Sequence, residues 1–130
     1  MEIKLDIVVK DEVLGNIITT AIEGASNYWY FLNEDACDII RSNSEGGKPF
    51  SVRILDAVKN GAEIPVHDIE DTGGERIGVL SSESIRTGLQ KIMDDEVMQK
   101  FLMSEIEGNG DGESSDVVFQ FMVMGEYVYG

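Results

Sequence analysis

The sequence predicts a single α+β domain over residues 1–130, in which about five to six short strands pack against about four helices. Two alternating periods carry this prediction, because some segments place apolar residues at every second position and others at every third or fourth. Clusters of Gly, Asn, Asp and Ser separate the segments. With 130 residues, 42% of them hydrophobic, the chain is long enough to bury one core and too short for two. Strands and helices do not alternate regularly, so the sheet is expected to be antiparallel or mixed.

The first elements are read from clear changes of period. Apolar residues alternate with charged ones over residues 2–10, which predicts a half-buried strand. Residues 11–23 follow a helical period and end at Gly24, a residue suited to a left-handed C-cap. The aromatic run over residues 28–32 favours a short strand.

Asn33 is expected to cap a brief helix over residues 34–41, and a loop over residues 42–49 follows it. Alternation then predicts a strand over residues 50–55, ending at the turn 59–61.

A second and a third strand are predicted over residues 64–68 and 76–80, joined by a turn at residues 71–74. With the preceding strand they would form a three-stranded meander. Pro65 suits an edge position, since proline has no N–H group to donate.

Ser81 or Ser82 can cap a helix whose apolar face is reset at Asp94–Asp95. We therefore expect two helices, or one kinked helix, between residues 82 and 106, with Asp95 as the second cap.

The last elements follow a polar loop at residues 108–114. Ser115 is expected to cap a helix over residues 116–124, Gly125 to end it, and residues 126–129 to form a final strand.

Charge narrows the classes of partner. With 25 acidic and 10 basic residues the formal net charge is −15, which argues against direct binding to nucleic acid or to anionic membranes. No basic residue follows Lys100, so an acidic face for a basic protein is one interpretation of the last third, and simple solubility is the other. The lone Cys37 excludes an intrachain disulfide, and the charged first residues do not resemble a signal peptide. We expect a cytoplasmic protein.

Catalytic groupings are nearly absent from the sequence. It has one histidine and one cysteine, and no serine stands in a nucleophile-elbow context. We expect a protein without catalytic residues, cofactor or metal. The spacing of acids over residues 105–116 is similar to a calcium loop, but Glu105 is a poor first ligand and Asp116 is short for the twelfth. An acidic solvated loop is the favoured interpretation.

The densest aromatic cluster offers a candidate ligand site. At least two rings of residues 28–31 must be core, and core packing is the simpler interpretation of all of them. The alternative is that an outward ring, with Asn27 beside it, stacks on a planar ligand such as a nucleobase. Phosphates would then need the helix start at residues 81–84, with Arg86 one turn in and Arg53 nearby. The ligand-binding residues so predicted are Asn27, Tyr28, Trp29, Arg53, Ser82 and Arg86.

Two stretches carry a resemblance to a family. Residues 20–29, TAIEGASNYW, resemble a T-A-L-E-G-G-x-N-Y-W signature. The ending, DVVFQ at 116–120 followed by GEYVYG at 125–130, resembles a D-x-x-x-Q…G-E-x-V-Y-G terminus. Both signatures occur in small, mostly uncharacterised proteins of bacteriophages and prophages. Ile22 and Ala25 depart from the first signature as packing changes. The resemblance implies a phage accessory protein and implies no reaction.

Together these observations favour a non-catalytic phage protein that counters host defence by sequestering a small nucleotide-like signal, in a site completed by a second subunit. The alternative is an acidic nucleic-acid mimic that blocks a basic host protein, either a nuclease or another DNA-binding protein. We also expect the two signature-bearing ends to be neighbours, because short aromatic strands such as 28–30 and 127–129 need pairing partners.

Overall fold

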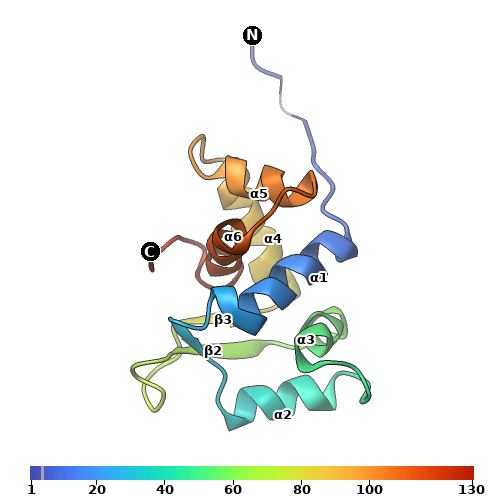
Figure 1. Ribbon diagram of the computed structural model, residues 1–130, viewed down its shortest axis with the longest axis vertical. Helices are drawn as coiled ribbons and strands as arrows, with labels where there is room; N and C mark the ends of the chain where they lie inside the picture. The colour runs from blue at the N-terminus through green and yellow to red at the C-terminus, as the bar shows by residue number, and fades with distance from the viewer. Residues whose placement is uncertain (4) are drawn as a thin grey trace.

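The computed structural model describes residues 1–3 and 5–130. Within these residues, six α-helices and a three-stranded antiparallel sheet form one compact body, from which the N-terminal segment projects (Figure 1). The α+β class is confirmed, but the chain has more helices and fewer strands than predicted. The helices are α1 (Asp11–Thr20), α2 (Glu34–Ser42), α3 (Phe50–Lys59), α4 (Ser82–Met93), α5 (Gln99–Ile106) and α6 (Gly112–Met124).

The sheet has the order β1-β2-β3, with strands β1 (Tyr30–Phe31), β2 (Ile64–Asp68) and β3 (Gly78–Leu80). The predicted hairpin of β2 and β3 is confirmed, and Ile64 pairs with Leu80. Pro65 was expected at an edge, yet β2 is the central strand. The strand accommodates it because the carbonyl of Val66 faces β3, so the Pro65 nitrogen faces the opposite side. There β1 pairs only with the last two residues of β2.

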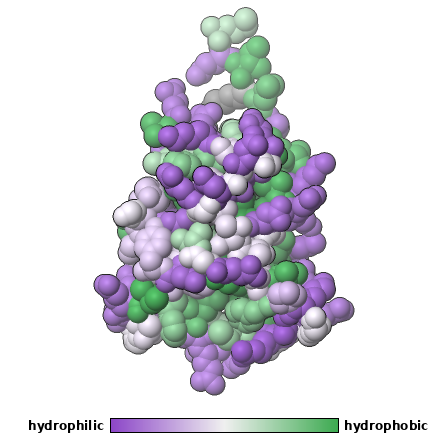
Figure 2. All heavy atoms as spheres, in the orientation of Figure 1, coloured by the Kyte–Doolittle hydropathy of each residue, from purple (hydrophilic) through white to green (hydrophobic). Residues whose placement is uncertain are grey.

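Helix α6 is the centre of the core. Every residue from Ser114 to Val123 is buried, and the helix packs against α1, α4, α5 and β3. A helix that is apolar on nearly all sides is typical of a fully buried element. Figure 1 shows α6 near the middle of the molecule, with α1 and α4 beside it, while Figure 2 shows hydrophilic side chains over much of the outer surface.

The predicted strand over residues 50–55 is wrong, because the segment is helix α3. Its inward residues Ser51, Ile54, Ala57 and Val58 recur at helical spacing. The alternation of Phe50, Val52 and Ile54 was misleading, because Val52 is exposed and does not share the buried face of Ile54. The meander therefore loses its first strand, and the two-residue β1 occupies that side of the sheet.

The predicted strands at both ends are also wrong. Residues 5–10 and 126–130 have no assigned secondary structure, and Lys4, within the predicted first strand, lies outside the described residues. Alternation favours an extended backbone, but a strand also needs a neighbour to pair with. The β1 strand is confirmed only over two of the five residues expected.

Most predicted helix ends are confirmed, but Gly24 is not a left-handed cap, because α1 ends at Thr20 and a π-helix, Ala21–Ala25, follows it. Asn33 caps α2, and Ser81 caps α4 in a capping box with Ser84.

The chain breaks after Met93 as expected, but Asp95 does not cap α5, whose N-cap is Met98. The Asp95 side chain instead accepts hydrogen bonds from the N–H groups of Val97 and Met98 in the turn before the helix.

The start of α6 differs from the prediction. Asp111, rather than Ser115, caps the helix, and Gly125 ends it in the left-handed conformation as expected. The earlier start moves Asp116 from the first turn to the helix interior.

Candidate functional site

Asp116 lies buried on α6, and its carboxylate accepts hydrogen bonds from side chains of residues 26–29, which are distant in the sequence. Its side chain is 7% exposed, and it is the one buried acid among the described residues. Oδ1 accepts hydrogen bonds from the Ser26 hydroxyl at 2.7 Å and from Trp29 Nε1 at 2.8 Å. Oδ2 accepts from the Tyr28 hydroxyl and from Gln120 Nε2, the latter at 3.3 Å. The buried carboxylate is thus surrounded by donors, which offsets the cost of burying its charge.

Gln120 lies one turn further along α6 and holds the C-terminal segment. Its Oε1 accepts from the backbone N–H groups of Val128 and Tyr129 at 3.0 and 2.9 Å. Its Nε2 donates to the Tyr129 carbonyl at 2.8 Å. A buried amide therefore supplies the bonds that a neighbouring strand would have made.

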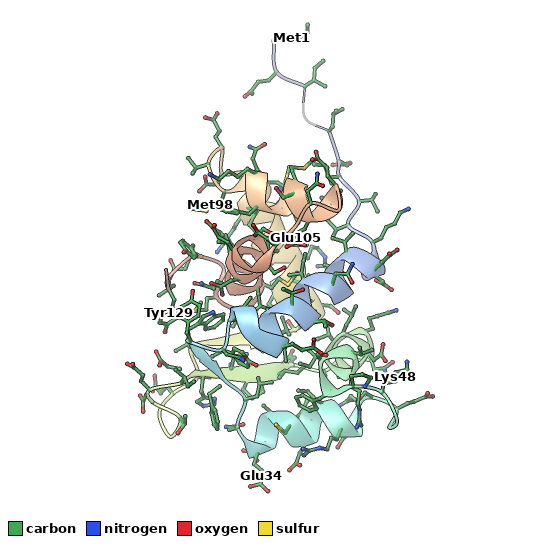
Figure 3. The ribbon with its side chains drawn as sticks, viewed as in Figure 1. Met1, Glu34, Lys48, Met98, Glu105 and Tyr129 are labelled. Atoms are coloured by element: carbon green, nitrogen blue, oxygen red, sulfur yellow. The ribbon has the colours of Figure 1, made fainter. Side chains whose placement is uncertain are left out.

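The Tyr129 side chain completes the attachment of the C-terminal segment to α6 and the sheet. Its ring stacks on the Trp29 ring, with centroids 5.5 Å apart and planes 10° apart. Its hydroxyl donates to Asp68 Oδ2 on β2 at 2.7 Å. Figure 3 shows Tyr129 beside α6 and above the sheet. The prediction that the signature-bearing ends are neighbours is confirmed, although side chains and not strand pairing join them.

The charged groups around this attachment are carboxylates. Burial, then the hydrogen bond and charge of Asp116, raise the pKa of Tyr28 far above its usual range. The Glu70 backbone N–H and the Tyr129 hydroxyl lower the pKa of Asp68. The Asp68 carboxylate in turn raises the pKa of Tyr129. Near neutral pH the phenols are therefore neutral donors and Asp68 is ionised.

Three large hydrophobic side chains of these segments remain exposed to solvent: Tyr28 at 52%, Tyr127 at 40% and Val128 at 50%. Asp68 and Glu70 lie close enough to the attachment to act on the Tyr129 hydroxyl. We call these five residues the tail surface. Aromatic faces beside carboxylates suit a cationic group, because the ring quadrupole and the negative charges both attract it.

The predicted ligand residues are only partly brought together. Asn27 and Tyr28 are exposed beside the C-terminal segment, but Trp29 is 1% exposed and its ring is covered by Tyr129. Trp29 therefore serves as a core residue, and Tyr28 is the outward ring.

The other three predicted residues lie elsewhere. Arg53 is on helix α3, not on a strand, and donates to the Ser44 hydroxyl and the Arg41 carbonyl. The Ser82 hydroxyl donates to the Val58 carbonyl. Arg86 lines a cavity between α4 and the N-terminal segment. These donors do not converge on Tyr28 in the described structure.

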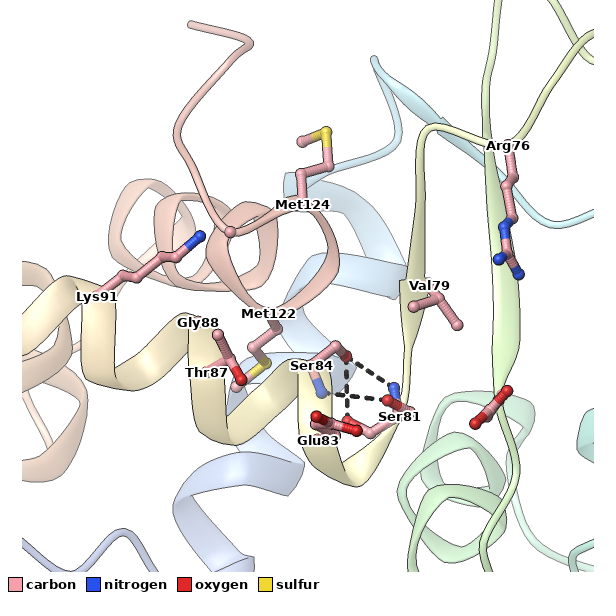
Figure 4. Close-up of a pocket in the computed structure, with 12 residues that line it drawn as sticks. Arg76, Val79, Ser81, Glu83, Ser84, Thr87, Gly88, Lys91, Met122 and Met124 are labelled. Carbon is pink, nitrogen blue, oxygen red and sulfur yellow. Dashed lines mark hydrogen bonds between the residues drawn. The ribbon is translucent and has the colours of Figure 1, made fainter.

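A different cavity of about 320 Å³ lies at the start of α4. Ser81, Ser84 and Thr87 line it, with Arg76 and Lys91 at its two ends (Figure 4). Among these residues, only the serines belong to the helix start that the sequence predicted as a phosphate site. Glu63 and Glu83 also line the cavity, so its charge is mixed.

The acidic segment 105–116 does not form a calcium loop. The Glu105 carboxylate accepts hydrogen bonds from the Ser114 and Ser115 hydroxyls at 2.7 and 2.6 Å, and Asp116 is engaged in the core. Over residues 1–3 and 5–130, no three His, Cys, Asp or Glu side chains are grouped so as to hold a metal ion. In the same part of the chain, no helix combines the length and the apolar character needed to cross a membrane.

Comparison with known proteins finds no matching family model and no significant match to a curated protein or a solved structure.

Proposed function

We propose that this chain is a non-catalytic acidic protein that binds a basic surface of another protein through the tail surface. The observation that carries the proposal is the exposed Tyr28 ring, which is hydrogen-bonded through its hydroxyl to the Asp116 carboxylate and to the Tyr129 carbonyl, while Asp68 and Glu70 lie at the Tyr129 hydroxyl of the same segment. The resemblance of both signatures to phage proteins supports a counter-defence role. The partner would be a host nuclease or another DNA-binding protein, whose nucleic-acid channel this chain occupies.

The overall charge supports the same proposal. The described residues form three ion pairs, Arg41–Asp38, Lys48–Asp56 and Lys59–Asp11, and all of them are solvent-accessible. Most of the 25 acids are thus left without a basic partner. Such a surface would steer a basic protein toward it over the Debye length, about 8 Å at physiological salt.

Competition with DNA tests this proposal directly. Host lysate is loaded on DNA-cellulose at low ionic strength, and the column is eluted with this protein. We expect it to release a discrete set of DNA-binding proteins, and to release much less of them at high salt. Elution of nothing beyond what buffer alone releases would contradict the proposal.

Variants assign the effect to the tail surface. Tyr127→Ala keeps the net charge and removes an exposed ring, and we expect it to release less protein. The matched control is Val97→Ala, which removes an apolar side chain that is 63% exposed on the α4–α5 turn. Equal release by both variants would place the activity elsewhere.

The cavity at the start of α4 favours a second candidate, the sequestration of a nucleotide-like signal. Arg76 and Lys91 could each pair with a phosphate, and the cavity volume of about 320 Å³ is at the small end of ligand sites. Isothermal titration with cyclic and ADP-ribose-type nucleotides tests it. Binding that Lys91→Gln abolishes would support this candidate, and no heat with any nucleotide would remove it.

A further inference from the structure

We propose that Asn109 is a site of spontaneous covalent modification, at which the backbone nitrogen of Gly110 attacks the Asn109 side-chain amide and water then yields aspartyl and isoaspartyl forms. The site lies in the loop between α5 and α6 (Figure 1) and contains no residue of the tail surface. It is selected by a difference between the two Asn-Gly pairs of the chain, Asn60–Gly61 and Asn109–Gly110.

The reaction needs only the chain and water. The Gly110 nitrogen loses its proton to solvent hydroxide and bonds to Cγ of Asn109, while the Cγ–Nδ2 bond breaks and ammonia leaves. The product is a five-membered succinimide ring. Water then opens the ring, either at Cγ to give an aspartyl residue or at the main-chain carbonyl to give an isoaspartyl residue. One carboxylate thus replaces one amide, and nothing is oxidised or reduced.

Glycine after asparagine favours this attack, because it has no Cβ to hinder the approach of its nitrogen. The chain has six asparagines, and four of them precede a residue with a side chain. These four pairs are Asn16–Ile17, Asn27–Tyr28, Asn33–Glu34 and Asn43–Ser44. Only the two Asn-Gly pairs remain as candidates.

The structure holds both reacting groups of the pair Asn60–Gly61. Asn60 Nδ2 donates to the Asn43 carbonyl at 2.8 Å, and the Gly61 N–H donates to the Val58 carbonyl at 3.0 Å. Asn60 is also the residue that ends α3. Attack at this pair would first have to break both hydrogen bonds and the end of the helix.

The pair Asn109–Gly110 is held only through its backbone start. Both residues are exposed and lie outside the helices and strands. The Asn109 N–H donates to the Ser104 carbonyl at 2.8 Å. Within residues 1–3 and 5–130, the Asn109 side-chain amide and the Gly110 N–H make no hydrogen bond. The side chain is therefore free to turn toward the Gly110 nitrogen.

Packing at this loop requires the glycine. A Cβ atom on Gly110 would overlap the carboxylate of Glu105. This carboxylate is itself held, because it accepts hydrogen bonds from the Ser114 and Ser115 hydroxyls at 2.7 and 2.6 Å. The fold thus maintains, next to an unrestrained asparagine, the one residue type that leaves the attacking nitrogen accessible.

The isoaspartyl product should disturb the start of α6. Two hydrogen bonds anchor the loop, from the Asn109 N–H to the Ser104 carbonyl and from the Asp111 N–H to Ser114 Oγ at 2.8 Å. An isoaspartyl residue adds one carbon to the main chain between these anchors. Because Asp111 caps α6, a shift of the second anchor would weaken the cap of the most buried helix.

Peptide mapping of the full chain after incubation in neutral and in mildly alkaline buffer tests the proposal. Tryptic cleavage at Lys59, Arg76 and Lys100 places the two pairs on separate peptides, and mass spectrometry measures the exchange of amide for acid in each. In the folded chain we expect Asn109 to react at least about tenfold faster than Asn60, because two hydrogen bonds protect the latter. Both reactions should be faster in the alkaline buffer.

Incubation in concentrated urea supplies the control, because neither pair keeps its surroundings in the unfolded chain. We expect the two pairs to react at similar rates there. Asn109→Gln should remove the fast reaction of the folded chain, since its longer side chain would have to form a six-membered ring. The matched variant Asn60→Gln should leave the rate at Asn109 unchanged. Equal rates at both pairs in the folded chain, or an Asn109 that reacts only in urea, would overturn the proposal.

Thermal melts test the effect on α6. Anion exchange isolates the modified chain, which carries one negative charge more than the unmodified one. The matched control is Asn109→Asp, which has the same charge and an ordinary backbone. We expect the isolated product to contain a fraction that melts several degrees below Asn109→Asp, as loss of a helix cap produces. A single transition at the melting temperature of Asn109→Asp would contradict the anchoring of the loop.

Discussion

At the scale of single residues, Asp116 joins segments that are about 90 positions apart in the chain. Its two oxygens accept from Ser26, Trp29, Tyr28 and Gln120, so both lone-pair sets are used. Because the network is buried, loss of the carboxylate would leave its donors unsatisfied, just as loss of the donors would leave the carboxylate unsatisfied.

Asp116→Asn is therefore expected to destabilise the fold. The new amide would direct N–H groups toward Gln120 Nε2, which is itself a donor, and one buried group would be left unsatisfied. The expected loss is about 1–3 kcal/mol of unfolding free energy. Urea denaturation followed by Trp29 fluorescence measures it. The control is Glu113→Gln, an exposed change in the first turn of the same helix. Equal midpoints for Asp116→Asn and the wild type would contradict this account.

Tyr28 should make stability depend on alkaline pH. Its phenol has a higher pKa in the folded chain than the usual 10.0 of the unfolded one. Its contribution is thus fully present below about pH 10 and is lost as the pH rises toward the folded pKa. Tyr28→Phe should be less stable near neutral pH, and its deficit should shrink as the pH is raised past 10. A deficit that stays constant over this range would show that the phenol does not titrate with unfolding.

The sequence could not reveal this arrangement. The signatures predicted that residues 28–30 and 127–129 are neighbours, and core packing was the simpler interpretation of Trp29. What was missed is that α6 starts at Gly112, which buries Asp116. The available signal for this buried network was the pair Asp116 and Gln120, which lie four residues apart in an apolar run. Polar side chains on a buried helix face must find hydrogen-bond partners.

At the scale of elements, α4 and α6 approach so closely that glycine is required at the contact. A Cβ atom on Gly88 would overlap the backbone carbonyl oxygen of Phe121. The contact is between backbones, so no side-chain rotation relieves it.

Gly88→Ala should consequently destabilise the fold by about 1–3 kcal/mol, since the two helices must separate. Gly46→Ala is the matched control, because nothing lies within 4 Å of its added Cβ. We expect the control to unfold within about 1 kcal/mol of the wild type. A thermal melt of the two variants is sufficient, and equal melting temperatures would contradict the close approach.

The C-terminal segment should also contribute to stability. Removing residues 126–130 leaves the amide of Gln120 without its backbone partners and uncovers the Trp29 ring. The melting temperature is expected to fall by several degrees, as a loss of about 1 kcal/mol produces in a domain of this size. An unchanged melting temperature would mean that the segment is not held in solution.

The prediction of elements succeeded where two signals agreed. Helix α2 had both an Asn33 cap and an inward apolar face, and the β2–β3 hairpin had both alternation and a turn. It failed at α3, where a short alternation competed with helical spacing. It failed at both termini because strand pairing depends on neighbours that local sequence does not specify.

At the scale of the whole molecule, the fold class and the acidic character could be predicted, but the grouping of the candidate site residues could not. The α+β class followed from mixed periodicity, and the acidic character from the count of 25 acids. Arg53 does not join the other predicted ligand residues because it lies on helix α3, and Ser82 and Arg86 lie on α4 as predicted but have other neighbours. The tail surface depends instead on contacts between distant parts of the chain.

The most direct test of the tail surface is a pair of NMR titrations of the ¹⁵N-labelled chain, one with an arginine-rich peptide and one with ATP. The account predicts that the peptide shifts the amide resonances of Tyr28, Glu70 and residues 126–129 most, and that Tyr127→Ala weakens its binding. It predicts no comparable shifts at these positions with ATP. Peptide shifts spread evenly over the acidic surface, or ATP shifts gathered at the tail surface, would contradict it.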